Sequence, residues 1–154
     1  MVKLAPDLFS MAKPEVWFTV ARQPRTFKLE DSDPGDGTIE GPFIIKRAQY
    51  YYLFVSLDHC CRGLKSDYNV VVGRSPKVEG PYVDKTGEKL NNGGGTLIAS
   101  GNEDWAAVGH NGICVDNGIY YLVCHGYDKH DNGRAKLIVR ELKWDKDDWP
   151  VVEL

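Results

Sequence analysis

The chain of 154 residues has no strong excess of positive charge, no long apolar run and no cysteine spacing of a zinc site. The net charge of −3 argues against a partner bound through its phosphate backbone, so no nucleic acid is expected. No apolar run approaches ~18 residues, so no membrane span is expected either. Residues 1–7 lack the long apolar stretch of an export signal.

Cysteine is scarce, with four residues in the chain: Cys60, Cys61, Cys114 and Cys124. This number does not make a disulfide scaffold, so the redox compartment stays open. The adjacent pair Cys60-Cys61 can close a disulfide ring or stand as two thiols in a loop. Cys114 and Cys124 lie inside apolar runs, which predicts two small, buried hydrophobic side chains.

Glycine, proline and aromatic residues are abundant, with 16 Gly, 8 Pro, 4 Trp, 8 Tyr and 5 Phe. This composition favours an all-β fold with many turns. Short apolar runs between turn signals predict four antiparallel strands at 43–47, 50–56, 68–74 and 80–84. The last run begins with Gly80-Pro81, which suits an edge strand, because proline cannot donate a ladder hydrogen bond.

The same pattern then repeats, with strands predicted at 110–115, 119–125, 135–142 and 149–152. Asn117-Gly118 joins the first two of these strands, and Asn-Gly is a favoured hairpin turn. Aligning Leu53 with Leu122 gives an offset of 69 residues, and the same offset places Val70 on Val139. Two successive four-stranded units of this kind are typical of β-propeller blades.

The sequence therefore predicts an all-β chain of about two to two and a half four-stranded antiparallel blades. Residues 1–38 would end a preceding blade and link it to the next. Residues 39–90 would form one blade and residues 91–154 the following one. Since propellers close with roughly four to eight blades, two blades leave open edges and faces. The chain is expected to belong to a longer protein, or to close as a homodimer or with a missing N-terminal half.

Several ordered motifs between about residue 39 and residue 149 resemble glycoside hydrolase family 43, most closely its endo-1,5-α-L-arabinanases. The motifs are Ile39-Glu40-Gly41-Pro42-Phe43, residues 50–56, Cys60-Cys61, Gly93-Gly94-Gly95-Thr96 and Gly109-His110-Asn111. The resemblance implies a five-bladed propeller that hydrolyses α-1,5-linked arabinan of plant cell walls with inversion, using three carboxylates. It also implies a secreted or periplasmic parent enzyme, although this chain shows no export signal of its own.

The resemblance places the general acid on Glu40. The base and the third carboxylate would lie in earlier blades, outside this sequence, so the isolated chain is expected to be inactive. The residue pattern agrees, because Glu40 comes just before the innermost strand of a blade, where strand starts crowd the propeller axis. An inverting hydrolase needs one protonated carboxyl and one carboxylate base. Apolar or acidic neighbours are expected to raise the pKa of the acid.

Three further residues are candidates for the cleft. The offset of 69 residues places His110 on Gly41, beside Glu40. In the family, the His of this motif helps to hold a central ion, usually calcium, mostly through water, so His110 is expected to contact the ion or the substrate. A hydrogen-bonded structural His is the alternative. One imidazole is a poor calcium site alone, since calcium prefers several oxygens. Asp58 and His125 are expected to bind substrate, with a solvated loop as the alternative for Asp58.

Two rival functions remain open at this point. A β-xylosidase or arabinofuranosidase of the same family is the rival enzyme, and the Cys60-Cys61 doublet with the 93–96 segment favours the arabinanase side. The doublet is familiar in arabinanases, where the cleft wall is its expected place. A non-catalytic carbohydrate-binding or assembly fragment is the rival outside enzymes, because an acid without a base should give almost no turnover.

Overall fold

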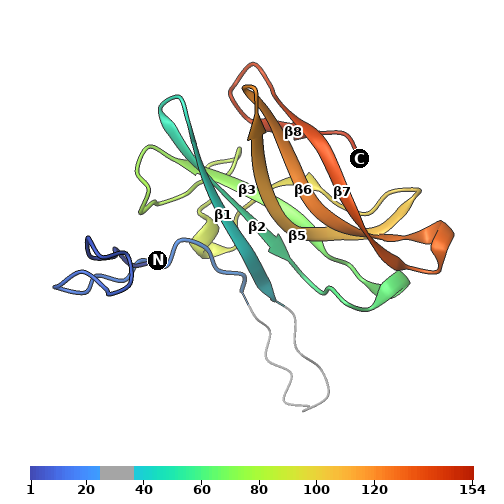
Figure 1. Ribbon diagram of the computed structural model, residues 1–154, viewed down its shortest axis with the longest axis horizontal. Helices are drawn as coiled ribbons and strands as arrows, with labels where there is room; N and C mark the ends of the chain where they lie inside the picture. The colour runs from blue at the N-terminus through green and yellow to red at the C-terminus, as the bar shows by residue number, and fades with distance from the viewer. Residues whose placement is uncertain (25–36) are drawn as a thin grey trace, which may run out of the picture.

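The computed structural model describes residues 1–24 and 37–154. The described residues form two four-stranded antiparallel sheets, each with its strands in chain order (Figure 1). The first sheet contains β1 (Ile39–Arg47), β2 (Tyr50–Leu57), β3 (Asn69–Ser75) and β4 (Thr96–Ala99). The second contains β5 (Trp105–Asp116), β6 (Ile119–Asp128), β7 (Arg134–Trp144) and β8 (Pro150–Val152). The described loops contain three short 3-10 helices: η1 (Gly63–Lys65), η2 (Leu90–Asn92) and η3 (Lys129–Asp131). The predicted all-β fold of successive antiparallel blades is confirmed.

The offset of 69 residues holds for the first two strands of each sheet. The bulge that follows Glu40 in β1 has its counterpart after Gly109 in β5. The alignment of Val70 with Val139 is wrong by two residues, because Val70 takes the position that Leu137 occupies in the second sheet. The reason is the connection to the third strand, which is longer between β2 and β3 than between β6 and β7.

The predicted fourth strand at 80–84 is wrong. Only Val83 makes isolated bridges there, and the fourth strand of the first sheet is β4. Pro81 has no N–H to donate, and the carboxylate of Asp84 accepts backbone N–H bonds from Glu88 and Gly95, which fold this segment into a turn. The first sheet therefore continues beyond the predicted limit at 90/91, and the break between sheets falls between β4 and β5. Of the segment 1–38, residues 25–36 lie outside the described part.

The main hydrophobic core lies between the two sheets. It includes Tyr52, Phe54 and Val72 of the first sheet and Leu122 and Ile138 of the second. A second cluster covers the other face of the first sheet, which explains the continuous burial of β2. The other face of the second sheet has no such cover among the described residues. It exposes a set of apolar side chains: Cys114, Ile119, Leu137, Val139 and Val151. The prediction that Cys114 is buried is wrong, because it faces this open side.

Arg74 joins the two sheets at their outer edge. Its guanidinium lies 4.4 Å from the ring centroid of Tyr50 and 4.3 Å from that of Trp149. Its Nη1 also donates a hydrogen bond of 2.6 Å to the carbonyl oxygen of Asp147. Arg47 makes a parallel contact, with Trp144 at 4.3 Å. Cationic side chains stacked on aromatic rings therefore seal the edge of the core.

The N-terminal segment extends from the side of the first sheet that faces away from the second (Figure 1). It makes isolated bridges between Val2 and Trp17 and between Leu4 and Met11. Its apolar side chains are largely exposed, with Phe9 at 95%. No helix among the described residues is both long and apolar enough to cross a membrane. The segment therefore presents apolar surface that nothing in the described chain covers.

We expect Arg74→Ala to lower the free energy of unfolding by about 2 kcal/mol, because it removes two stacking contacts and a hydrogen bond at the sheet junction. Urea unfolding followed by tryptophan fluorescence measures the change. Lys143→Ala on an exposed position of β7 is the control and should stay within about 0.5 kcal/mol of the wild type. Equal stability of the two variants would remove Arg74 from this role.

Candidate active site

Glu40 stands at the start of β1, where this strand carries a bulge. Glu40 pairs with Ser56 of β2, and the register then shifts before Phe43. Gly41, inside the bulge, has φ +58°, a left-handed conformation that costs glycine little. The bulge brings β1 against β5, because a Cβ atom at Gly41 would lie 3.5 Å from the Cα atom of His110. The local sequence thereby sets the carboxylate at the junction of the two sheets.

Among the residues with a described placement, two side chains contact the carboxylate of Glu40. The hydroxyl of the buried Tyr68 donates a hydrogen bond to Oε1, and Nδ1 of His110 lies 3.4 Å from the same oxygen. The hydrogen bond from Tyr68 is the main cause that lowers the pKa of Glu40, while partial burial opposes it and His110 adds to it. The expectation of a raised pKa is wrong for the described chain, because both neighbours stabilise the charged form. The side chain remains 46% exposed.

His110 is fixed through its backbone. The buried Ser56 Oγ accepts a hydrogen bond of 2.9 Å from the N–H of His110 and donates one of 2.8 Å to Oδ1 of Asn111. His110 has φ +53° and lies in the bulge of β5, so its backbone departs from the regular geometry of a strand. The side chain of His110 is 63% exposed. The backbone is therefore held rigidly while the imidazole remains accessible.

His125 of β6 completes the group around Glu40. Its ring centroid lies 5.8 Å from that of Tyr68 and 6.5 Å from that of His110. Burial lowers the pKa of His125, and the neighbouring His110 lowers it further, so the neutral form is favoured. Its Nε2 lies 3.1 Å from the hydroxyl of Tyr127. The structure brings Glu40, His110 and His125 together at the junction of the two sheets.

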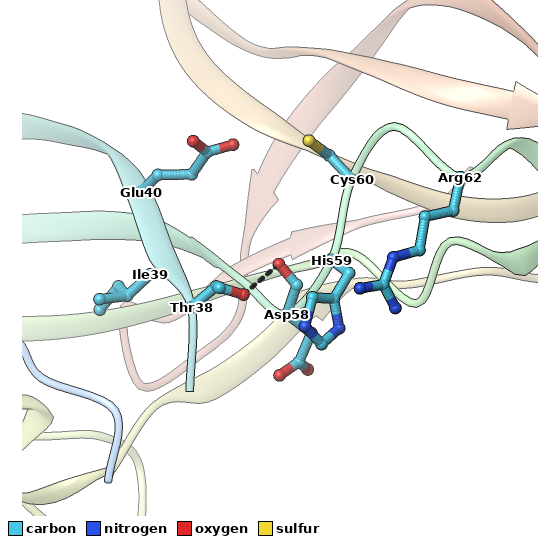
Figure 2. A pocket seen from close by; sticks show the side chains of 7 residues that line it. All are labelled: Thr38, Ile39, Glu40, Asp58, His59, Cys60 and Arg62. Atoms are coloured by element: carbon cyan, nitrogen blue, oxygen red, sulfur yellow. Dashed lines mark hydrogen bonds between the residues drawn. The ribbon is translucent and has the colours of Figure 1, made fainter. Parts of the chain in front are cut away.

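A cavity of about 330 Å³ lies beside Glu40. Figure 2 shows that its walls come from the start of β1 and from the loop after β2. Seven residues line it: Thr38, Ile39, Glu40, Asp58, His59, Cys60 and Arg62. A carboxylate at the edge of an open cavity can donate or accept a proton at a bound molecule.

Asp58 lines this cavity, but its carboxylate points away from Glu40 (Figure 2). Its Oδ1 accepts a hydrogen bond of 2.9 Å from Gln23, and its Oδ2 accepts one of 2.7 Å from Asn69. Its carbonyl oxygen also accepts a hydrogen bond of 2.6 Å from the hydroxyl of Thr38. Each carboxylate oxygen of Asp58 therefore already accepts one hydrogen bond, and the residue anchors the loop after β2 to Gln23, Thr38 and Asn69.

The adjacent cysteines Cys60 and Cys61 form a disulfide, which decides between the two alternatives. The N–H of Cys61 donates a hydrogen bond of 2.6 Å to the hydroxyl of Tyr127. Cys60 packs against a small buried cluster that contains Tyr68 and Tyr127. The disulfide loop of the first sheet is thereby attached to the second sheet next to His125.

Sequence reasoning missed Tyr68 and Ser56, whereas it placed Tyr127 near the cleft together with His125. Tyr68 and Ser56 lie in or beside an apolar strand and look like ordinary core residues from the sequence. Their hydroxyl partners are 28 and 55 residues away in the chain. The sequence signal that bears on Tyr68 is Gly109. A Cβ atom at this position would lie 2.2 Å from the ring of Tyr68. The glycine of the Gly-His-Asn motif is therefore needed to make room for Tyr68.

The described residues contain no group of three or more His, Cys, Asp or Glu side chains that could hold a metal ion. The carboxylate of Glu40 lies next to His110, and its Oε1 accepts the hydrogen bond from Tyr68. Because calcium takes six to eight oxygen ligands, His110 can supply one position of such a site and no more.

Two four-stranded antiparallel sheets in tandem, each with a bulge in its first strand, define this chain as part of a β-propeller. The sequence profile of glycosyl hydrolases family 43 matches residues 6–150, and the chain belongs to this family. The resemblance found in the sequence motifs is thus confirmed.

Two curated proteins of known activity are similar to this chain in sequence. The chain is 44% identical over 153 residues to an extracellular exo-α-(1→5)-L-arabinofuranosidase of Cellvibrio japonicus, covering 99% of this chain and 44% of the relative. It is 43% identical over 114 residues to an extracellular endo-α-(1→5)-L-arabinanase of Bacillus subtilis, covering 74% of this chain and 34% of the relative. The chain therefore spans less than half the length of these two curated relatives.

Solved structures agree with the sequence comparison. The α-L-arabinanase of Cellvibrio cellulosa, solved with arabinohexaose, superimposes with a TM-score of 0.90 at 45% identity, over 99% of this chain and 48% of that one. An exo-1,5-α-L-arabinanase from a bovine ruminal metagenomic library superimposes with a TM-score of 0.87 at 41% identity, over 99% of this chain and 48% of that one. These neighbours are five-bladed propellers, so the chain is a partial propeller.

Tyr68→Phe should raise the pKa of Glu40, because it removes the hydrogen bond that stabilises the carboxylate. In the wild type the pKa of Glu40 lies below its unfolded value. This carboxylate therefore stabilises the fold above the unfolded pKa of about 4.3, and the contribution is lost as the pH falls through the folded pKa. Carboxyl-carbon NMR titration measures the midpoint. Tyr121→Phe is the control, and an unchanged midpoint in Tyr68→Phe would contradict the assignment.

Ser56→Ala should cost about 1–3 kcal/mol of unfolding free energy, because it leaves the buried Asn111 side chain and the N–H of His110 without their shared partner. Thermal and urea unfolding measure the loss. Ser100→Ala, at a partly exposed position outside the strands, should be close to neutral. A loss as small as that of Ser100→Ala would show that water replaces the hydroxyl.

Proposed function

We propose that this chain is the C-terminal part of an inverting glycoside hydrolase that cleaves α-1,5-linked arabinan, with Glu40 as its general acid. The observation that carries the proposal is the carboxylate of Glu40 at the open cavity, in a chain that matches 48% of an arabinanase of known structure. The names of the relatives support arabinan or arabino-oligosaccharides as the substrate. Both curated relatives are named extracellular, which supports a secreted parent protein.

The chemistry requires a second carboxylate that the described cavity does not offer. Inversion needs a base about 6.5–9.5 Å from the acid, with room for a water molecule between them. Asp58 is the other described carboxylate that lines the cavity, and its oxygens already bond Gln23 and Asn69. The base would therefore come from the missing half. Acidic groups brought near Glu40 would also offset Tyr68 and raise the pKa of Glu40 until it holds a proton.

His110 and His125 would bind the substrate and would not take part in the proton transfer. Their imidazoles lie beside Glu40 and can exchange hydrogen bonds with sugar hydroxyls. Calcium at the propeller axis is part of the same proposal, with His110 as one contact, direct or through water. Oxygen groups of the missing half would supply the remaining ligands.

Association is the second part of the proposal. Leu137, Val139 and Val151 leave one face of the second sheet open, and the N-terminal segment exposes Phe9 on the opposite side of the chain. Such surfaces are the expected contacts between neighbouring blades. The missing N-terminal half would cover both. A homodimer, which would hold about four blades, is the alternative cover.

An exo-acting arabinofuranosidase is the alternative activity, because one relative carries this name. Endo and exo action would differ through the loops on the other side of the cleft. A β-xylosidase finds no support among the relatives described above. A non-catalytic fragment that binds carbohydrate or assembles with a partner remains the alternative for the chain acting alone.

The isolated chain should release almost no sugar from linear arabinan, and mixing it with the N-terminal half of the Cellvibrio japonicus relative should restore hydrolysis. Proton NMR of the product should show inversion at the anomeric carbon. Glu40→Gln should then reduce the rate on arabinan by about 10²–10⁴-fold, because the leaving oxygen is no longer protonated. The loss should be much smaller on an arabinofuranoside with an activated phenolic leaving group.

Two results would contradict this assignment. Equal losses of Glu40→Gln on both substrates would leave Glu40 as a positioning residue. Rapid hydrolysis by the isolated chain, abolished in Glu40→Gln, would mean that a base is present within the chain or its own oligomer. Leu137→Lys is the assembly control and should block the restored activity by placing a charge in the sheet interface.

A further inference from the structure

We propose that the Cys60–Cys61 disulfide is the apolar platform on which a pentose ring packs in the cavity beside Glu40. This inference rests on the proposed function, because it assigns a sugar contact within the same site. It adds a binding role for a group whose chemistry hydrolysis does not require. The doublet would act by contact alone, so no bond forms or breaks at the two sulfur atoms during turnover.

The position of the disulfide carries the inference. Cys60 lines the cavity together with Glu40, from the loop that follows β2 (Figure 2). Its Sγ and the carboxylate of Glu40 project toward the same side of the cavity in this view. A sugar whose glycosidic oxygen reaches Glu40 would therefore have a ring against Cys60.

Among the described residues that line the cavity, Cys60 with its disulfide is the apolar group on which a sugar ring can pack. Sugar rings present C–H faces that pack on flat apolar groups, commonly on aromatic side chains. No Phe, Tyr or Trp is among the described residues that line this cavity. Thr38 and Asp58 are bonded to each other, and Ile39 packs into the cluster on the far face of the first sheet. The disulfide takes the place of an aromatic ring.

The platform is rigid, which reduces the entropy lost when a ligand binds. The disulfide removes the rotamer freedom of two side chains, and the N–H of Cys61 is bonded to the Tyr127 hydroxyl at 2.6 Å. Farther along the loop, Gly133 packs so closely that a Cβ atom there would lie 2.5 Å from the nitrogen of Leu64. The second sheet thus holds the loop in place from two points.

The experiment follows the four cysteines of the chain in one spectrum. The chain is labelled with ¹³C at the cysteine Cβ atoms and titrated with arabinohexaose, with cellohexaose as the control sugar. The Cβ signals of Cys60 and Cys61 should shift and saturate with arabinohexaose alone. Cys114, on the open face of the second sheet, and Cys124, in the core, are internal controls and should not move. Amide signals of Gly41 report independently on sugar binding beside Glu40.

A variant tests the contribution to affinity. Cys60→Ala combined with Cys61→Ala should weaken binding of arabinohexaose about tenfold, as expected for the loss of a modest apolar contact. Cys114→Ala should bind like the wild type. Reducing the disulfide in the folded wild-type chain should weaken binding similarly and should leave the double variant unchanged, which separates loss of the platform from misfolding of the variant.

The failure of this inference is distinguishable from that of the proposed function. Saturable shifts at Gly41 without shifts at Cys60 and Cys61 would overturn the platform and keep the sugar site. Unchanged affinity in the double variant would do the same. No shift with arabinohexaose at any of these positions would remove the cavity as an arabinan site, and the platform with it.

Discussion

The buried hydroxyl of Ser56 is the contact on which the site depends. It belongs to the first sheet, yet it bonds the N–H of His110 and the side chain of Asn111 in the second. Bulges at equivalent places in β1 and β5 make this contact possible, since each frees backbone groups from the regular ladder. One hydroxyl in a dry junction therefore fixes where Glu40 and His110 stand relative to each other.

The pKa of Glu40 is lowered by the described residues around it. Tyr68 and His110 stabilise its negative charge, which is the opposite of what a general acid near neutral pH requires. The other carboxylate among the described residues that line the cavity is that of Asp58, which already accepts hydrogen bonds from Gln23 and Asn69. Under the proposed function, Glu40 would be one half of an acid–base pair, and the rest of the propeller would cover the exposed apolar faces. Both features agree with the share of the relatives that the chain spans, which is less than half.

Much of the fold could be predicted from the sequence because strand signals are local. Short apolar runs between turn signals, together with the Asn117-Gly118 turn, predict seven of the eight described strands. The fourth strand was misplaced, since Gly80-Pro81 looks like an edge strand until the carboxylate of Asp84 folds the chain back. The alignment of the two repeats is wrong by two residues after the second strand. The loop before the third strand differs in length between the sheets, and the repeat pattern does not fix loop lengths.

The sequence by itself determined the class of fold, the family and the candidate carboxylate, because those depend on patterns and motifs along the chain. Only the tertiary structure decided what surrounds Glu40. Tyr68 reaches it from 28 residues away, and the doublet is tied to Tyr127, 66 residues beyond Cys61. Asp58, a candidate by position, is turned toward Gln23 and Asn69 instead. The direction of a side chain follows from the packing of one sheet on another, and no local pattern encodes that packing.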